Sequence, residues 1–119
     1  MNLFKRWFWP RSARSDAMSL YKKGLTCSER KDLTGALEAY TLAIESPDAP
    51  EDVKAMALYN RALVLAANGA VEEAQSDLQV VMNLPVPLHA IKLAAKRRLE
   101  RLKHRDEAAI SRQAGRSTA

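Results

Sequence analysis

The sequence has few residues that could carry out catalysis or bind a metal. Its 119 residues include one cysteine, Cys27, and only two histidines, His89 and His104. One thiol excludes an intramolecular disulfide and a cysteine-based metal cluster, and the two histidines have no neighbours at ligand spacing. The sequence shows no glycine-rich phosphate loop and no nucleophile paired with a base. We therefore expect a protein that is not an enzyme and has no metal, cofactor or small-molecule substrate.

Long hydrophobic runs are also missing. No stretch approaches the roughly 18 apolar residues of a membrane-spanning helix. The N-terminus does not resemble an export signal, because Lys5 and Arg6 interrupt its apolar run, Pro10 ends it, and no small-residue cleavage site follows. The expected location is the cytoplasm, with peripheral contact at the inner face of a membrane as the alternative.

Aromatic residues are scarce and unevenly placed. They make up 6% of the chain, and every Phe and Trp lies within the first nine residues. Charge is uneven as well: residues 1–15 have a net charge of +4, residues 16–88 of −5 and residues 89–119 of +6. The first segment therefore forms an aromatic and basic arm ahead of an acidic body, and it contains Phe4, Lys5, Arg6, Trp7, Phe8 and Trp9.

The rest of the chain has the pattern of an all-α protein. A hydrophobic content of 47% with 28% charged residues is typical of a folded chain. Apolar residues recur at spacings of three and four, which predicts helices at about 16–28, 33–46, 49–69, 70–85 and from 88 onward. Prolines or an Asn-Gly pair separate several of these runs. No run alternates with the period of two that a strand requires, so we expect about five helices and no sheet.

The first two predicted helices resemble the next two. A shift of 38 residues places Leu20 on Leu58, Gly24 on Ala62, Ala36 on Ala74 and Tyr40 on Leu78. Small residues stay small under this shift, and bulky residues stay bulky. Small residues let the two helices of a hairpin approach closely, and bulky ones fill the space between them. The sequence therefore predicts two α-hairpin repeats.

The stretches GALEAYTLAIESP and LYNRALVLAANGAVEEA resemble the tetratricopeptide repeat family, over about residues 17–85. The chain departs from that family in having Leu20 and Leu58 at its tryptophan position and Lys23 and Arg61 at its inner leucine position. The resemblance implies two hairpins within residues 16–85, after the arm of residues 1–15. A basic capping helix with a frayed tail follows in residues 86–119. Two repeats make a thin core, so we expect either tight packing of the last helix or a homo-oligomer.

In this family the first helix of each repeat lines a concave groove that receives a peptide or helix. The resemblance therefore implies that this chain is an adaptor that binds a protein or peptide partner. Members that clamp chaperone tails use a lysine and two asparagines, of which only Asn60 is present here; Tyr21 and Leu25 occupy the other two places. An apolar segment or amphipathic helix is the expected ligand. The implied groove residues are Met18, Tyr21, Leu25, Met56, Tyr59, Asn60 and Leu63.

Three alternatives stay open for the arm: contact with an anionic membrane, docking in an apolar groove of this chain or of another copy, or no function. A membrane-associated helper anchored by the arm is thus a second hypothesis for the whole protein. A third hypothesis is nonspecific nucleic-acid binding by the basic last helix. That helix has no interleaved aromatic residues for base stacking, so nucleic acid is an unlikely partner.

Overall fold

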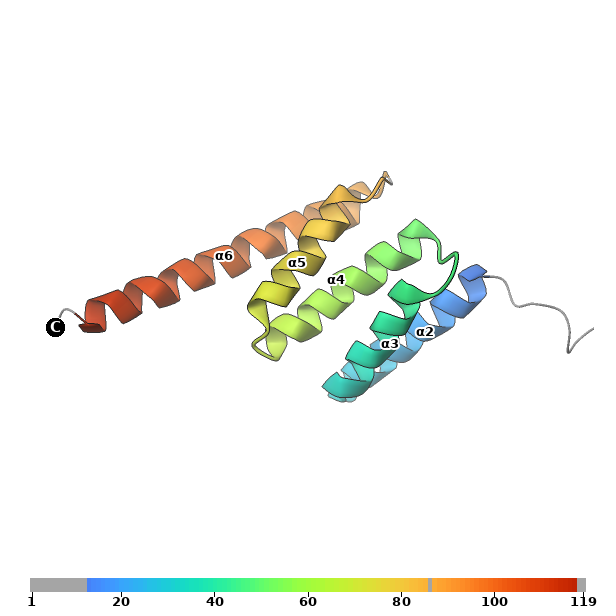
Figure 1. The fold of residues 1–119 in the computed structure, drawn as a ribbon, viewed down its shortest axis with the longest axis horizontal. Helices are drawn as coiled ribbons and strands as arrows, with labels where there is room; N and C mark the ends of the chain where they lie inside the picture. Colours follow the sequence, from blue (N-terminus) through green and yellow to red (C-terminus); the bar gives the residue numbers. More distant parts are fainter. Residues whose placement is uncertain (1–12, 86, 118–119) are drawn as a thin grey trace, which may run out of the picture.

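The computed structural model describes residues 13–85 and 87–117. The described residues form five helices joined by short loops, and they contain no strand. The protein is all-α, as the sequence predicts (Figure 1). The helices are α2 (Ala13–Glu29), α3 (Leu33–Glu45), α4 (Glu51–Ala67), α5 (Val71–Asn83) and α6 (His89–Ser117).

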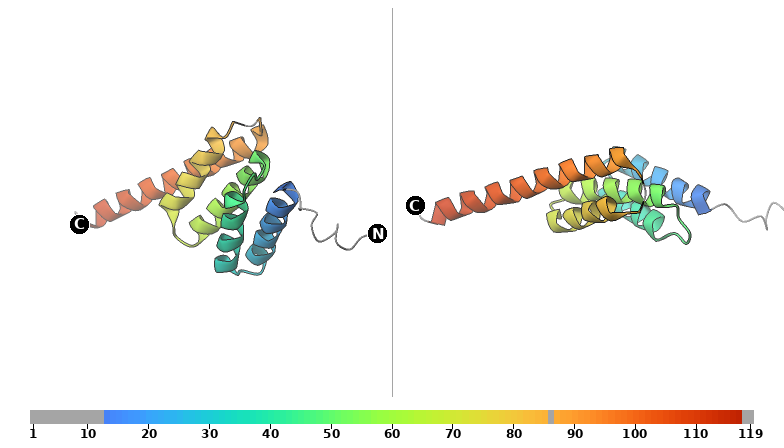
Figure 2. Two further views of the ribbon diagram at one scale, coloured as in Figure 1. Left: turned by 45° about the vertical axis from the view of Figure 1, so that its right-hand side comes forward. Right: turned by 90° about the horizontal axis from the view of Figure 1, so that it is seen from above.

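The helices are arranged as two hairpins followed by one long helix. The pairs α2–α3 and α4–α5 form the hairpins, and α6 packs on the second of them. Helix α4 is central and contacts each of the other four described helices, whereas α3 and α5 do not contact each other. In the view from above, α2 and α6 lie along one side of the molecule, and α3 and α5 lie along the other (Figure 2). Helices α2, α4 and α6 lie in sequence with α4 contacting both of the others, and we call these three helices the inner layer.

Both hairpin turns end their first helix in the same way. After α4, the Gly69 N–H donates to the carbonyl of Ala66 and the Ala70 N–H donates to that of Leu65, with Gly69 at a φ of 84°. After α2, the Lys31 N–H donates to Ser28 and the Asp32 N–H donates to Cys27. These bonds satisfy carbonyl groups that the helix leaves free, and they require a left-handed residue after the helix. Lys31 adopts that conformation with a φ of 63°.

Side chains and prolines set the other helix ends. The Asp32 carboxylate accepts a hydrogen bond of 3.0 Å from the Gly35 N–H and so caps the start of α3. Helix α3 ends at Glu45, and Ser46 takes an extended conformation before Pro47, as the sequence predicts. The sequence pattern places the start of the first helix at about residue 16, but α2 begins at Ala13 and Asp16 lies in its first turn. An acid in the first turn is favourable, because it faces the positive end of the helix dipole.

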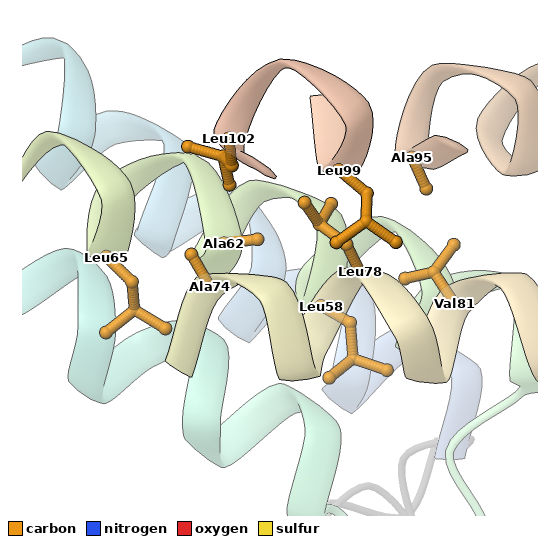
Figure 3. Packing of buried hydrophobic residues seen from close by; sticks show 9 residues of the cluster. All are labelled: Leu58, Ala62, Leu65, Ala74, Leu78, Val81, Ala95, Leu99 and Leu102. Carbon is orange, nitrogen blue, oxygen red and sulfur yellow. The ribbon is translucent and has the colours of Figure 1, made fainter. Parts of the chain in front are cut away.

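The largest buried cluster joins α4, α5 and α6. Each helix contributes three apolar side chains at spacings of three and four, so that each presents one stripe to the others (Figure 3). The members are Leu58, Ala62 and Leu65 of α4, Ala74, Leu78 and Val81 of α5, and Ala95, Leu99 and Leu102 of α6. A separate cluster around Tyr40 holds the first hairpin against α4. The last helix therefore covers the face of the second hairpin, much as α4 covers the face of the first.

Only the first half of α6 takes part in this packing. Beyond Leu102, every described side chain up to Arg116 is exposed except Asp106, which is half-buried. Helix α6 projects beyond the two hairpins in Figure 1. The sequence predicts fraying at Gly115, but the helix continues to Ser117. One glycine costs an exposed helix only about 1 kcal/mol, which is not enough to end it here.

Within residues 13–85 and 87–117, no helix has both the length and the apolar character needed to cross a membrane. The same part of the chain contains no group of three His, Cys, Asp or Glu side chains that could hold a metal ion.

Candidate functional site

The groove residues that the family resemblance implies all lie on α2 and α4 of the inner layer, and all are half-buried. Helices α2 and α4 are in contact, so these residues lie along one helix–helix boundary. They differ in what they touch. Most of them pack on buried clusters at the boundary between the hairpins, whereas Leu63, within the described part of the chain, packs on none of these clusters.

Tyr21 and Asn60 form a polar link between α2 and α4. The Asn60 side-chain amide donates to the Tyr21 hydroxyl at 3.1 Å and to the Met56 backbone carbonyl at 2.9 Å. Both hydrogens of that amide are therefore used within the protein. Burial raises the pKa of Tyr21, and the hydrogen bond from Asn60 partly offsets the rise. This hydrogen bond connects α4 directly to α2.

The apolar groove residues divide among three buried clusters. Met18, Tyr21 and Met56 pack around Ala17, Ala49 and Val53, at the end of the boundary where α2 and α4 begin. Leu25 packs on the cluster around Tyr40, and Tyr59 packs on the α4–α5–α6 cluster, away from Met18. Leu63 is half-buried and, among the described residues, is not one of those packed on any of the three clusters.

An apolar hollow adjoins Met56, between the first turns of α4 and α6. Its volume is about 510 Å³, which falls within the roughly 300–1,000 Å³ of ligand pockets. We call it the α4–α6 pocket. Apart from Asp52 and His89, its lining is apolar: Met56 from α4, Pro87 and Leu88 from the preceding loop, and Ala90 and Ile91 from α6. Of these residues, sequence reasoning placed only Met56 in the groove, because helix periodicity alone does not say where α6 begins relative to α4.

One rim of this pocket is an ion pair between the hairpins. The Arg14 guanidinium of α2 donates two hydrogen bonds to the Asp52 carboxylate of α4, at 2.8 and 3.2 Å. These bonds lower the pKa of Asp52 below its usual 3.8. The pair brings the start of α2 to the edge of the α4–α6 pocket.

A second ion pair lies between α3, α4 and α5. The Arg61 guanidinium donates two bonds of 2.7 Å to the Asp77 carboxylate and one of 3.1 Å to the Thr41 hydroxyl. Asp77 is buried, and the Arg61 side chain is 23% exposed. Sequence reasoning missed this contact, although Arg61 was visible as a departure from the family pattern. The available signal was a second departure, because Asp77 lies where the 38-residue shift places the small residue Ala39.

The basic side chains of α6 are mostly free of the body. Lys96, Arg97, Arg101, Lys103 and Arg105 are exposed. Lys92 instead donates a 2.6 Å hydrogen bond to the Leu84 carbonyl near the end of α5. The other candidate site of the sequence, the arm with Phe4, Lys5, Arg6, Trp7, Phe8 and Trp9, lies outside the described residues.

Comparison of the chain with protein-family models, curated proteins and solved structures finds no match. The fold and the geometry of the inner layer are therefore the basis for a functional hypothesis.

Proposed function

We propose that the protein is a non-enzymatic interaction module of the tetratricopeptide-repeat type, which binds an apolar peptide or amphipathic helix along its inner layer. The observation that carries the proposal is the half-buried apolar surface of α2 and α4, continued by the α4–α6 pocket. Methionine and tyrosine suit such a surface, because methionine adapts its shape and tyrosine keeps a polar end. The internal repeat of 38 residues supports the same proposal.

A ligand with a free carboxylate end fits this surface poorly. The amide hydrogens of Asn60 already bond to Tyr21 and Met56, and the lysine of the carboxylate clamp is missing. An ionised end would lose its charge-assisted bonds in such a groove. The proposed ligand is therefore recognised by its apolar side chains.

Leu63 is the best position for a test. Tyr21 and Tyr59 both pack on buried clusters, so changing them also disturbs the fold. Leu63→Arg introduces a charge at the groove surface, and Leu42→Arg is the matched control, because Leu42 is 54% exposed on α3. We expect a partner captured from native lysate by the unmodified chain to be lost with Leu63→Arg and kept with Leu42→Arg.

Circular dichroism melting curves of both variants should match those of the unmodified chain. Equal capture by all three proteins would exclude the inner layer as the binding surface. A photo-crosslinking amino acid at position 63 should also form one discrete covalent adduct with a protein of the lysate. The same amino acid at position 42 should form none.

A further inference from the structure

The four Phe and Trp side chains of the sequence all lie outside the described residues. Among the described residues, the buried members of the three clusters are aliphatic residues, alanines and Tyr40. Aromatic side chains bury about 150–250 Å² each when packed, so four of them are a large apolar surface for one short stretch. We call residues 4–9 the aromatic segment.

The α4–α6 pocket lies close to the point where this segment joins the fold. Helix α2 begins at Ala13, and the next residue, Arg14, bonds directly to Asp52 of the pocket lining. Trp9 precedes Ala13 by four residues, a span of at most about 14 Å for an extended chain, and Phe4 precedes it by nine, about 30 Å. Because Arg14 already contacts Asp52 of the pocket lining, tethers of this length can bring the segment to the pocket.

Charge favours the same encounter. The segment contains Lys5 and Arg6, and Arg11 follows it, with no acidic residue before Asp16. The first turn of α4, beside the pocket, carries Asp52, which is paired with Arg14, and Glu51, whose carboxylate is 3.8 Å from the Lys54 ammonium, and residues 16–88 have a net charge of −5. Opposite charges attract the segment to this end of the molecule, and the ion pair of Arg14 with Asp52 shows that such a contact forms there.

We propose that the aromatic segment occupies the α4–α6 pocket of its own molecule. Trp and Phe side chains of the segment pack against Met56, Leu88 and Ile91, and its basic side chains face the acidic first turn of α4. The tether makes this binding intramolecular, which raises the effective concentration of the segment at the pocket to about the millimolar range. A partner that needs the pocket must then displace the segment.

Tryptophan fluorescence tests the proposal directly, because Trp7 and Trp9 are the only tryptophans of the chain. The full chain should emit at shorter wavelength than a synthetic peptide of residues 1–12, and acrylamide should quench it several-fold less. Ala90→Arg puts bulk and positive charge into the pocket and should move both signals toward those of the peptide. Leu93→Arg is the matched control, because Leu93 is exposed on the same helix outside the pocket lining, and it should leave both signals unchanged.

Methyl-resolved NOE spectra of the unmodified full chain give a second measurement that needs no substitution. Contacts of the Trp7 or Trp9 indole with the methyl groups of Met56 or Ile91 are expected. Peptide-like emission of the full chain in buffer, together with the absence of these contacts, overturns the proposal.

Two further outcomes overturn it in favour of another occupant. A blue shift that disappears on dilution assigns the segment to the pocket of a second copy. A blue shift that appears only with vesicles of phosphatidylserine and phosphatidylcholine assigns it to a lipid surface. Neither outcome changes the evidence for the proposed function, because the Leu63→Arg capture experiment tests that function at a residue outside the pocket lining. The two proposals can therefore fail separately.

Discussion

The first hairpin pairs Gly24 of α2 with Tyr40 of α3, whereas the second has Ala62 and Leu78 at the positions 38 residues later. A Cβ atom added at Gly24 would collide with ring atoms of Tyr40, whose side chain is 1% exposed. One hairpin thus combines the smallest residue with a large ring, and the other combines two residues of intermediate size. The comparison teaches that in both hairpins the first helix supplies the small residue and the second helix the bulky one, and that a smaller partner on one helix goes with a larger partner on the other.

The two hairpin turns differ in a similar way. Position 31 is a lysine in the left-handed conformation and position 69 is a glycine, so only the first turn carries a steric cost. In exchange, Asp32 caps α3 with its side chain, whereas Ala70 makes no such bond at the start of α5. The first turn therefore has the better helix cap, Asp32, and the second turn has the better left-handed residue, Gly69.

The hairpins differ most in charge. Arg61 and Asp77 form a two-bond ion pair in the second hairpin, whereas Lys23 is exposed and Ala39 buried at the equivalent places in the first. Arg61 also bonds to Thr41 of the preceding hairpin. Through the bond to Thr41 of α3, the ion pair of the second hairpin is part of the boundary between the two hairpins.

Exchanging the packing pairs is the strongest test of the volume comparison. Tyr40→Leu should destabilise the protein by about 2–3 kcal/mol, because it leaves a cavity beside Gly24. Gly24→Ala should cost about 1–2 kcal/mol, since the clash with the ring outweighs the better helix propensity of alanine. The double variant reproduces the small-to-large balance of the second hairpin. Its destabilisation should be at least about 1 kcal/mol smaller than the sum of the two single destabilisations, which is within the range of coupling energies of residues in contact. Urea unfolding measures all three, and additive effects would contradict the comparison.

Removing one partner of the buried ion pair should have the next largest effect. Asp77→Ala removes the carboxylate acceptor of the Arg61 guanidinium and leaves it only the Thr41 hydroxyl, at a cost of about 1–2 kcal/mol. This lies below the roughly 3–5 kcal/mol of a fully buried pair, because Arg61 retains some exposure to water. Changing both residues to apolar ones, as in Arg61→Met with Asp77→Ala, should restore most of the loss. A double variant no more stable than Asp77→Ala would show that the loss does not come from leaving the guanidinium unpaired.

Each turn can be improved with the residue of the other. Lys31→Gly removes the left-handed strain and should stabilise the protein by about 0.5–1 kcal/mol. Ala70→Asp supplies the missing cap of α5 and should add about 1 kcal/mol, helped by Glu73 three residues later. Thermal melting of the two single variants checks both values. The reverse changes, Gly69→Lys and Asp32→Ala, should lower the melting temperature, and a rise with either would refute the interpretation.

The ion pair between Arg14 and Asp52 should have the smallest effect, because it is largely exposed to water. Arg14 lowers the pKa of Asp52, so the pair stabilises the folded protein above the ordinary carboxyl value of 3.8. That contribution is lost as the pH falls through the lowered pKa of the folded state. Melting temperatures of the unmodified chain and of Arg14→Gln should differ slightly at neutral pH and converge in acid. A difference that persists below about pH 2 would point to a cause other than the charge of Asp52.

Much of the fold could be predicted from the sequence. The stripes at spacings of three and four predict the helices, and Pro47 and Gly69 mark boundaries where the structure has them. Local patterns succeed in these cases because helix formation and chain reversal depend mainly on nearby residues. The sequence left open whether the last helix packs on the second hairpin or the chain self-associates, and the structure has Ala95, Leu99 and Leu102 of α6 buried against that hairpin.

Less of the candidate site could be predicted from the sequence. Its α2 and α4 residues could be named from the resemblance, but their separate contacts could not. Tyr21 bonds to Asn60 across 39 positions, Arg14 to Asp52 across 38, and Arg61 to Asp77 across 16. No local period encodes such partners.

The sequence by itself determined that the chain forms helices, that two hairpins repeat, and that the aromatic residues gather outside that repeat. Only the tertiary structure decided that Arg61 bonds to Asp77, that Ile91 and Met56 line one hollow, and that the start of α2 lies at its rim. The reason is physical. Helix and turn preferences act over a few residues, whereas a pocket is formed by side chains from separate helices, whose relative positions are set by the packing of the whole core.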